Sequence, residues 1–291
     1  MKKTLFAIFI CLLPLFPLFA EEDVREETES AGPERGLSVR GTLGAKVNPL
    51  GASLVNKLYY TEPLYGERSG VLWDSARMQM GITNEFTPAY DDLSIELFVE
   101  PVAFFEFRVN AGVRTAYNLF GYGFSTAESY EEEPGEPEDA LETGWFIRLA
   151  PTVKAALGPL VFLNTFTWSH FSFDVGYANA DAGHFYEPVH NVVIKNSDSL
   201  MKNSTTLLYN FPLENETRVL TGLEYALLYV PGSQFRRQEL SFLGVVQIPF
   251  EEKEMSVDGG FLLKSYIEDS ERDFRVGDLT PGLQIGITKK L

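Results

Sequence analysis

The sequence predicts an all-β chain that folds into a single closed antiparallel β-barrel and crosses a membrane. Three observations lead to this fold class: long segments in which apolar and polar residues alternate, connections that are in turn short and long, and an abundance of Phe, Tyr and Gly. Alternation with a period of two is typical of a strand with one apolar and one polar face. Soluble sheets usually use strands of about 5 or 6 residues, whereas strands of about 10 suit a barrel with lipid outside and a polar interior.

The clearest alternating segment is 105–117, which reads FEFRVNAGVRTAY. From Phe105 onward the odd positions are almost all apolar. The even positions, from Glu106 to Arg114, are polar or small. One face of this strand therefore suits lipid and the other suits water, and the remaining strands are predicted by comparison with it.

The N-terminal residues 1–20 have the three parts of a secretory signal peptide, namely a basic start, an apolar run and a small residue, Ala20, at the expected cleavage point. The alternative is an uncleaved anchor helix, which Pro14 and Pro17 disfavour because proline interrupts a helix. Residues 21–36 are acidic and lack apolar periodicity, so they are predicted to be a disordered leader. The barrel is then expected to occupy residues 37–291.

Composition excludes several function classes. The single cysteine, Cys11, lies within the predicted signal peptide, so a mature chain would have no disulfide and no cysteine chemistry. Removal of residues 1–20 takes away two lysines and no acid, which changes the formal net charge from −17 to −19. Such a charge argues against nucleic acid as a partner, because phosphates need a basic face. Polar residues interrupt the best candidate for a membrane-spanning helix, 155–173.

Twelve strands are expected, with ten as the alternative count. Alternation places them at residues 37–47, 54–60, 77–86, 93–99, 104–117, 145–154, 160–173, 200–211, 216–229, 239–248, 255–266 and 279–289. The segment 54–60 alternates only weakly. The pattern leaves open whether residues 48–74 form a hairpin or fold into the barrel.

The connections alternate in length along the chain. Short turns are predicted around Val102, Gly158, Leu213 and Glu251, which places the two longest loops, 119–143 and 174–199, at the opposite end of the barrel. The last strand then ends on the short-turn side. Outer-membrane barrels have this arrangement, with short periplasmic turns and long extracellular loops.

On this pattern, residues 37–291 resemble bacterial outer-membrane β-barrel proteins, porin-like in the broad sense, and carry no family-specific motif. The resemblance implies export by the signal peptide in a Gram-negative-type envelope, insertion by the barrel-assembly machinery, contact with outer-membrane lipid and a polar lumen. It implies a passive pore for small solutes or a structural barrel. No cofactor, metal or enzymatic activity is expected. A soluble periplasmic β protein that binds a ligand or partner is a further alternative.

Charged and polar residues of the inward parity are the candidates for the lumen lining. They are Glu96, Glu100, Glu106, Arg108, Asn110, Arg114, Arg148, Lys154, Arg218, Glu224, Asp258 and Lys264. Rings of charge in a pore set its preference for ions and solutes. The alternative is that these residues pair with one another and fill a narrow barrel.

A histidine and a serine on one predicted strand suggest a different function. His170 and Ser172 are expected on the same face, where a histidine base could serve a serine nucleophile. Here the chain resembles the outer-membrane lipid hydrolases, which carry a His-x-Ser pair on a barrel strand. The bulky neighbour Phe171 departs from the small or amide residues around that pair, and an interfacial histidine beside a strand serine is the favoured interpretation.

The two longest loops contain residues that could bind metal. His184, Glu187 and His190 lie close together in the sequence, but their spacing fits no zinc pattern, so exposed loop histidines are expected. The loop 119–143 carries eight acidic residues without a calcium-loop pattern, and a solvated extracellular loop is expected. These residues are Glu128, Glu131, Glu132, Glu133, Glu136, Glu138, Asp139 and Glu142.

Overall fold

The computed structural model describes residues 33–47, 51–65, 70, 72–119, 122–123, 125–130, 141–173, 183–213, 217–250, 253–270 and 276–291. The predicted signal peptide, 1–20, lies outside the described residues, as does the predicted leader apart from its last four residues. No helix within the described part of the chain is long and apolar enough to cross a membrane.

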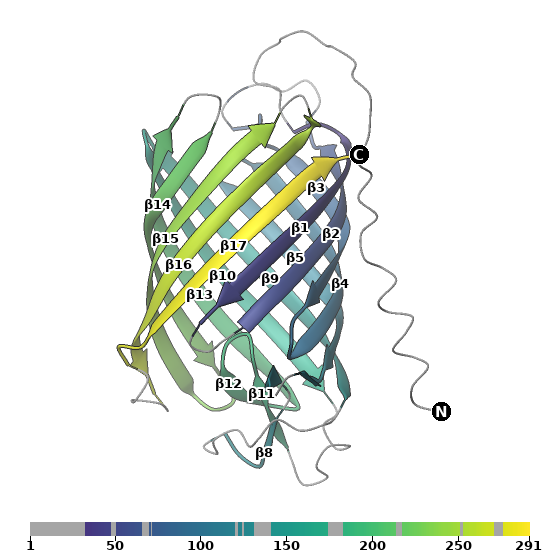
Figure 1. Ribbon diagram of the computed structural model, residues 1–291, viewed down its shortest axis with the longest axis vertical. Coiled ribbons are helices and arrows are strands. Elements are labelled where there is room, and N and C mark those ends of the chain that lie inside the picture. Colours follow the sequence, from purple (N-terminus) through teal and green to yellow (C-terminus); the bar gives the residue numbers. More distant parts are fainter. Residues whose placement is uncertain are drawn as a thin grey trace. The chain divides into compact units, whose positions relative to one another are not determined.

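The long strands of the described residues close into one antiparallel barrel (Figure 1). They are β1 (Gly36–Lys46), β2 (Gly51–Pro63), β3 (Arg77–Phe86), β4 (Tyr90–Val102), β5 (Phe105–Ala116), β9 (Glu142–Leu157), β10 (Leu160–Phe173), β13 (Ser197–Pro212), β14 (Arg218–Val230), β15 (Phe235–Phe250), β16 (Met255–Asp269) and β17 (Leu279–Lys290). Each pairs with its neighbour in the chain, and β1 pairs with β17 to close the ring, for example Gly41 opposite Ile287. The predicted fold class and the count of twelve strands are confirmed.

The alternation of the sequence becomes an outer and an inner face of the wall. On β5 the outward Val113 is 47% exposed, whereas its neighbour Arg114 points inward and is 1% exposed. The outer positions of the other wall strands are likewise mostly large and apolar, including the exposed Leu43, Ile95 and Leu283. Because each strand hydrogen-bonds to two neighbours, the closed wall leaves no free strand edge.

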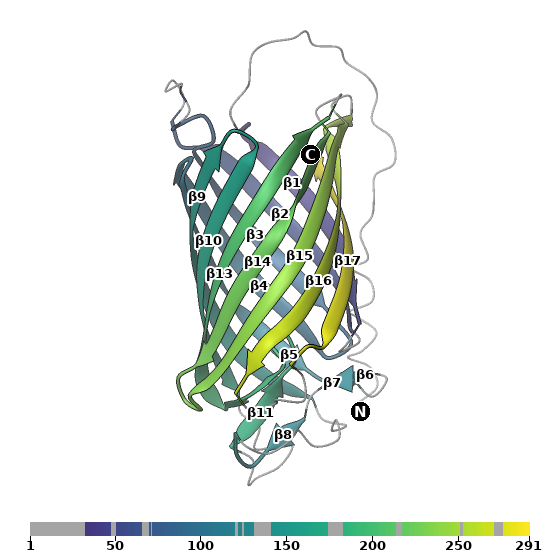
Figure 2. The ribbon, with the colours of Figure 1, turned by 90° about the vertical axis from the view of Figure 1, so that its left-hand side faces the viewer.

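The two ends of the barrel differ, as Figure 2 shows. The strands place the short connections 103–104, 158–159, 213–217 and 251–254 at the end where β17 finishes, called here the turn end. The long connections 117–141 and 174–196 lie at the other end, called here the loop end. The predicted arrangement of short and long connections is therefore confirmed for these strands.

The turn end carries one longer connection, 64–76. The sequence left residues 48–74 open, and the structure makes 13 of them, Gly51–Pro63, the regular strand β2, which is longer than the predicted 54–60. In this connection Leu72 O accepts a hydrogen bond from Ala103 N at 3.0 Å. This bond fixes the connection to the turn between β4 and β5.

The connection 174–199, predicted as a plain loop, contains a hairpin. Its strands are β11 (His184–Glu187) and β12 (Val192–Lys195), and β11 also pairs with the two-residue strand β8 (Thr126–Ala127). A further short pair, β6 (Asn118–Leu119) with β7 (Tyr122–Gly123), lies in the connection after β5. Strands of two to four residues are too short to show alternation, which is why the sequence pattern missed them.

The hairpin β11–β12 packs its apolar side chains against the inner wall at the loop end. Phe185, Val192 and Ile194 belong to one buried apolar cluster, called here the mouth core. Its wall members are Ala116, Phe146, Phe171, Phe173, Leu200, Leu228, Val230 and Phe235. The barrel therefore has a dry, packed region inside its loop end, and this region holds the turn of the hairpin in place.

Candidate functional site at the loop end

The turn of the β11–β12 hairpin presents three polar residues to the wall. Glu187 and Val192 are opposite in register, and Asn191 N donates to Glu187 O at 2.8 Å to close the turn. Asn191 has φ 58°, a left-handed conformation that asparagine tolerates better than most residues. The side chain of Glu187 accepts from His190 N at 2.7 Å, so the carboxylate is held by its own turn.

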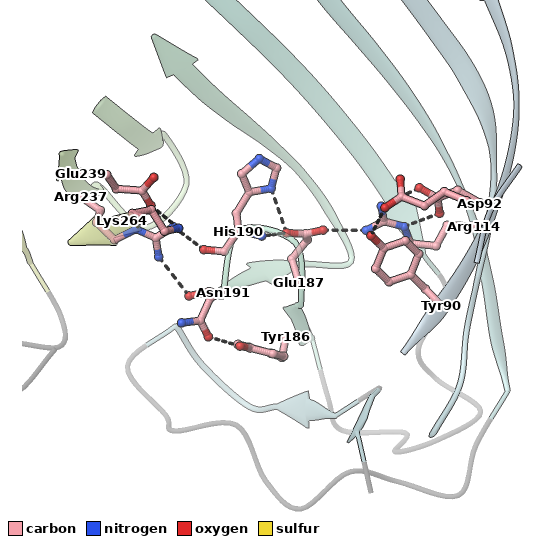
Figure 3. Close-up of polar contacts among 11 residues, drawn as sticks. Tyr90, Asp92, Arg114, Tyr186, Glu187, His190, Asn191, Arg237, Glu239 and Lys264 are labelled. Atoms are coloured by element: carbon pink, nitrogen blue, oxygen red, sulfur yellow. Dashed lines mark hydrogen bonds and ion pairs between the residues drawn. The ribbon is translucent and has the colours of Figure 1, made fainter. Parts of the chain in front are cut away.

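The wall strand β5 holds one side of the turn through Arg114. Its guanidinium forms a bidentate pair with Asp92 of β4, with N–O distances of 2.6 and 2.7 Å, and donates to Glu187 Oε1 at 2.6 Å (Figure 3). The guanidinium carbon of Arg114 lies 4.1 Å from the centroid of the Tyr90 ring. Glu187 is 0% exposed, so this is a buried charge pair whose partners satisfy each other.

The wall strand β15 holds the other side of the turn through Arg237. Arg237 donates to the backbone carbonyls of His190 and Asn191. Its Nε donates to Glu239 Oε1 at 2.9 Å. The carboxylate of Glu239 also lies 3.4 Å from Lys264 Nζ. Two buried arginines therefore contact opposite sides of one hairpin turn.

The two anchoring strands lie nearly opposite each other in the barrel. In the order of the wall, four strands separate β5 from β15 in one direction and six in the other. A turn that contacts both Arg114 and Arg237 must reach across the interior, as Figure 3 shows. The hairpin therefore narrows the loop-end mouth of the barrel.

Two groups of the turn have shifted pKa values. Burial lowers the pKa of His190, and the nearby carboxylate of Glu187 only partly offsets this. Burial alone would raise the pKa of Glu187, but the charges and hydrogen bonds of His190 and Arg114 outweigh it and hold the pKa well below its usual range. At neutral pH the turn therefore holds an ionised Glu187 beside a neutral His190.

The structure places the twelve predicted lumen residues on the inner side of the wall, where many of them pair. Glu96 contacts Lys57 and accepts from Asn110, and Arg108 lies 3.9 Å away. The remaining pairs are Lys154 with Glu100 and Glu106, Asp258 with Arg40, Lys264 with Glu239, Glu224 with Thr206, and Arg114 with Asp92 and Glu187. Arg148 lies over the ring of Phe146, and Arg218 is exposed.

These contacts agree in part with each interpretation of the lumen charges, the charge-lined pore and the interior filled by paired charges. Most of the acids are neutralised by a neighbour, as the packing alternative expects. The side chain of Arg108 is nevertheless 48% exposed and that of Arg40 41%, so water reaches the inner wall at these positions.

Sequence reasoning missed Asp92, Arg237, Glu239 and Lys202 as interior groups. Arg237 and Glu239 share the inward parity of β15, but the predicted strand began at Glu239 and so left Arg237 in a loop. Asp92 was placed in a loop in the same way, although β4 begins at Tyr90. Asp92 and Arg237 were missed because they lie near strand ends, whereas Lys202 and Glu239 lay within predicted strands and were not included among the lumen residues.

His170 and Ser172 do not form a pair in the structure. Both lie on the outer face of β10, but His170 Nδ1 lies 3.0 Å from Ser199 Oγ on the adjacent β13. The imidazole ring lies beside Trp145 at 5.3 Å and Trp168 at 6.0 Å between ring centroids. The surroundings are those of an outward-facing aromatic patch.

The possible metal ligands of the second loop are not assembled. His184 packs against Tyr130, with ring centroids 4.5 Å apart, while His190 binds Glu187. Within the described residues no three His, Cys, Asp or Glu side chains form a metal-binding group. The expected exposure of His190 is wrong, because its side chain, in the turn of the hairpin, is only 16% exposed. In the acidic loop, residues 131–140 lie outside the described part of the chain.

Several solved structures match this chain at low sequence identity. The beta domain of the Bordetella autotransporter Brka matches with 10% identity and a TM-score of 0.47, covering 88% of this chain and 99% of that chain. The translocator domain of autotransporter NalP from Neisseria meningitidis matches with 11% identity and a TM-score of 0.48, covering 89% and 90%. An outer membrane channel from Pseudomonas putida F1 matches with 9% identity and a TM-score of 0.43, covering 91% and 100%.

With identities near 10% and TM-scores below 0.5, these similarities assign neither a family nor a function to the chain. No family model and no curated protein sequence matches it.

Proposed function

We propose that this chain is an outer-membrane channel for small solutes, with the hairpin β11–β12 narrowing its extracellular mouth. The observation that carries the proposal is the inversion of polarity across a closed wall: large apolar side chains outside, charged and hydrogen-bonded side chains inside. In lipid a closed barrel satisfies every backbone hydrogen bond within the wall. The loop end would face the outside of the cell and the turn end the periplasm.

The outer surface also argues against a soluble β protein. Most of the exposed large apolar residues lie on the outward parity of the wall strands and surround the barrel, for example Leu58, Ile82, Leu223 and Ile285. Contiguous apolar patches beyond a few hundred Å² are rare on soluble monomers and mark a membrane or protein interface. A lipid bilayer covers such a band on all sides at once.

The interior supports a route for solutes. Inward-facing arginines such as Arg40 and Arg108 keep a large part of their surface accessible, which a fully packed interior would not allow. The mouth core fills only the loop end, where the hairpin docks. A polar interior that is open to water below a narrowed mouth suits the passage of small hydrophilic molecules better than large ones.

The test is the electrical conductance of the purified chain in a planar lipid bilayer. Heat-modifiable migration in detergent first establishes that the barrel is folded. Steady conductance steps are then expected. A folded barrel that gives no conductance under any voltage or salt condition would contradict the channel and leave a structural role.

Lipid hydrolysis is a second candidate, favoured by the contact between His170 and Ser199. A histidine nitrogen 3.0 Å from a serine hydroxyl on the outer face has the geometry of a base and a nucleophile. If this pair acts on lipid esters, Ser199→Ala abolishes hydrolysis and Ser172→Ala does not. Equal ester hydrolysis by Ser199→Ala and the unmodified chain would exclude it, and conductance is unaffected in either case.

A further inference from the structure

Four basic side chains lie on the inner side of the loop end, within the run of strands from β13 through β14, β15, β16 and β17 to β1. They are Lys46 of β1, Lys202 of β13, Arg237 of β15 and Lys264 of β16, called here the basic ledge. Lys202 and Arg237 both lie opposite Leu228 in the strand registers. Lys264 lies opposite Thr280 of β17, two residues before the partner of Lys46. The ledge therefore occupies one continuous part of the wall between β13 and β1.

The carboxylates of this wall are fewer than its cations. Glu239 is shared by Arg237, Lys264 and Lys202, at 2.9, 3.4 and 4.0 Å. Asp269, opposite Arg237 in register, is the other buried acid of this wall. In the part of the chain that the structure describes, Lys46 has no ion pair; the charges of Lys264 and Arg237 repel it, and that of Glu187 attracts it. Glu224 of β14 is a third carboxylate of this wall, opposite Ser241 as Lys264 is. Three carboxylates thus face four cations.

The excess positive charge is local to the ledge. The hairpin presents His190 to it, which is neutral at pH 7 because burial lowers its pKa. Across the mouth, Arg114 pairs with Asp92 and Glu187, and Tyr90 Oη donates to Glu85 at 2.9 Å. The whole chain has a net charge of −17, so a basic interior surface does not follow from composition.

We propose that the basic ledge binds a small oxyanion, a carboxylate or phosphate group, and that the channel consequently favours anions over cations. Lysine is a flexible point charge that suits such a group, and the shared Glu239 leaves each lysine only partly neutralised. The narrowed mouth brings any passing solute close to these ammonium groups. The preference for anions rests on the proposed channel function, whereas the binding of an oxyanion does not.

The experiment therefore measures binding and permeation separately. Inorganic phosphate is titrated with the folded chain in a phosphate-free detergent, and binding is read from the broadening of its ³¹P resonance. The same protein is placed in a planar bilayer under a KCl gradient, and the reversal potential gives the ratio of chloride to potassium permeability. The variants are Lys202→Gln and Lys46→Gln. Lys253→Gln is the matched control, because Lys253 is exposed in the turn between β15 and β16.

Each variant of the ledge should weaken phosphate binding about fivefold, which corresponds to about 1 kcal/mol, roughly the attraction of two unit charges 4 Å apart in water. The permeability ratio should shift toward potassium in both variants and stay unchanged in Lys253→Gln. Binding without conductance would support the ledge while refuting the channel. Conductance without phosphate binding, or equal binding by the ledge variants and the control, would overturn the ledge. Testing each lysine singly covers the case in which one variant fails to fold.

Discussion

Substituting Glu187 by alanine removes the carboxylate that Arg114 and His190 both contact in the docked hairpin. Arg114 keeps its bidentate pair with Asp92, but one buried Nη group loses its acceptor. Removal of one partner from a buried ion pair costs about 3–5 kcal/mol. The mouth core still holds the hairpin, since burial of a Phe, Val or Ile side chain contributes about 1.5–3 kcal/mol each. The variant is therefore expected to keep a folded barrel with a more weakly docked hairpin.

The assay is hydrogen exchange at the amide of Asn191, which donates to Glu187 O within the turn. A loss of 3 kcal/mol in docking free energy corresponds to about a hundredfold faster exchange through local opening. The mean conductance in a planar bilayer should rise at the same time, because an undocked hairpin no longer narrows the mouth. Glu106→Ala is the matched control, since Glu106 pairs with a basic side chain of the inner wall, Lys154, and this pair does not involve the hairpin. Unchanged exchange and conductance in Glu187→Ala would refute the anchoring role of this carboxylate.

Two further predictions concern pH and the barrel wall. Docking of the hairpin lowers the pKa of both His190 and Glu187, so the docked hairpin binds fewer protons than the undocked one. Docking is therefore strongest above the ordinary histidine pKa of about 6.5. It weakens as the pH falls below that value, and weakens further below the ordinary glutamate pKa. Conductance measured from pH 8 to pH 4 should therefore rise on acidification, and a flat or falling profile would contradict this coupling. In the wall, a Cβ on Gly222 would lie 1.9 Å from Leu207 O, whereas one on Gly259 meets nothing within 4 Å. Gly222→Ala should therefore destabilise the folded barrel by about 1–3 kcal/mol, seen as a lower temperature of heat modification, and Gly259→Ala should not.

The strands of the wall were predictable from the sequence because lipid and water impose opposite polarity on neighbouring residues. In β5 every second side chain, from Glu106 to Arg114, carries this signal over the whole strand. A signal repeated along each of twelve strands survives local exceptions. The ends of strands lack it, and Gly51, Tyr90 and Arg237 were therefore left in loops although each belongs to a wall strand.

The candidate site was only partly predictable, because its contacts join residues far apart in the chain. Arg114 and Glu187 are separated by 73 residues, and no local pattern links them. Arg114 was predicted to face the interior, but its partner lay in a segment assigned to an exposed loop. The three consecutive apolar residues Val192, Val193 and Ile194 were the available signal, since such a run is unusual in a solvated loop and is typical of a segment buried on both sides.

The two arginine anchors differ in what they contact, and this difference bears on how the mouth is held. Arg114 contacts a side chain, Glu187, whose charge depends on pH. Arg237 contacts the backbone carbonyls of His190 and Asn191, which cannot titrate. Acid can therefore weaken the contact to β5 while the contact to β15 persists, so the hairpin should swing about the side of the basic ledge rather than leave the mouth. The hairpin would then still partly cover the ledge when the mouth is wider. The channel should therefore still favour anions over cations at the acidic pH where its conductance has risen.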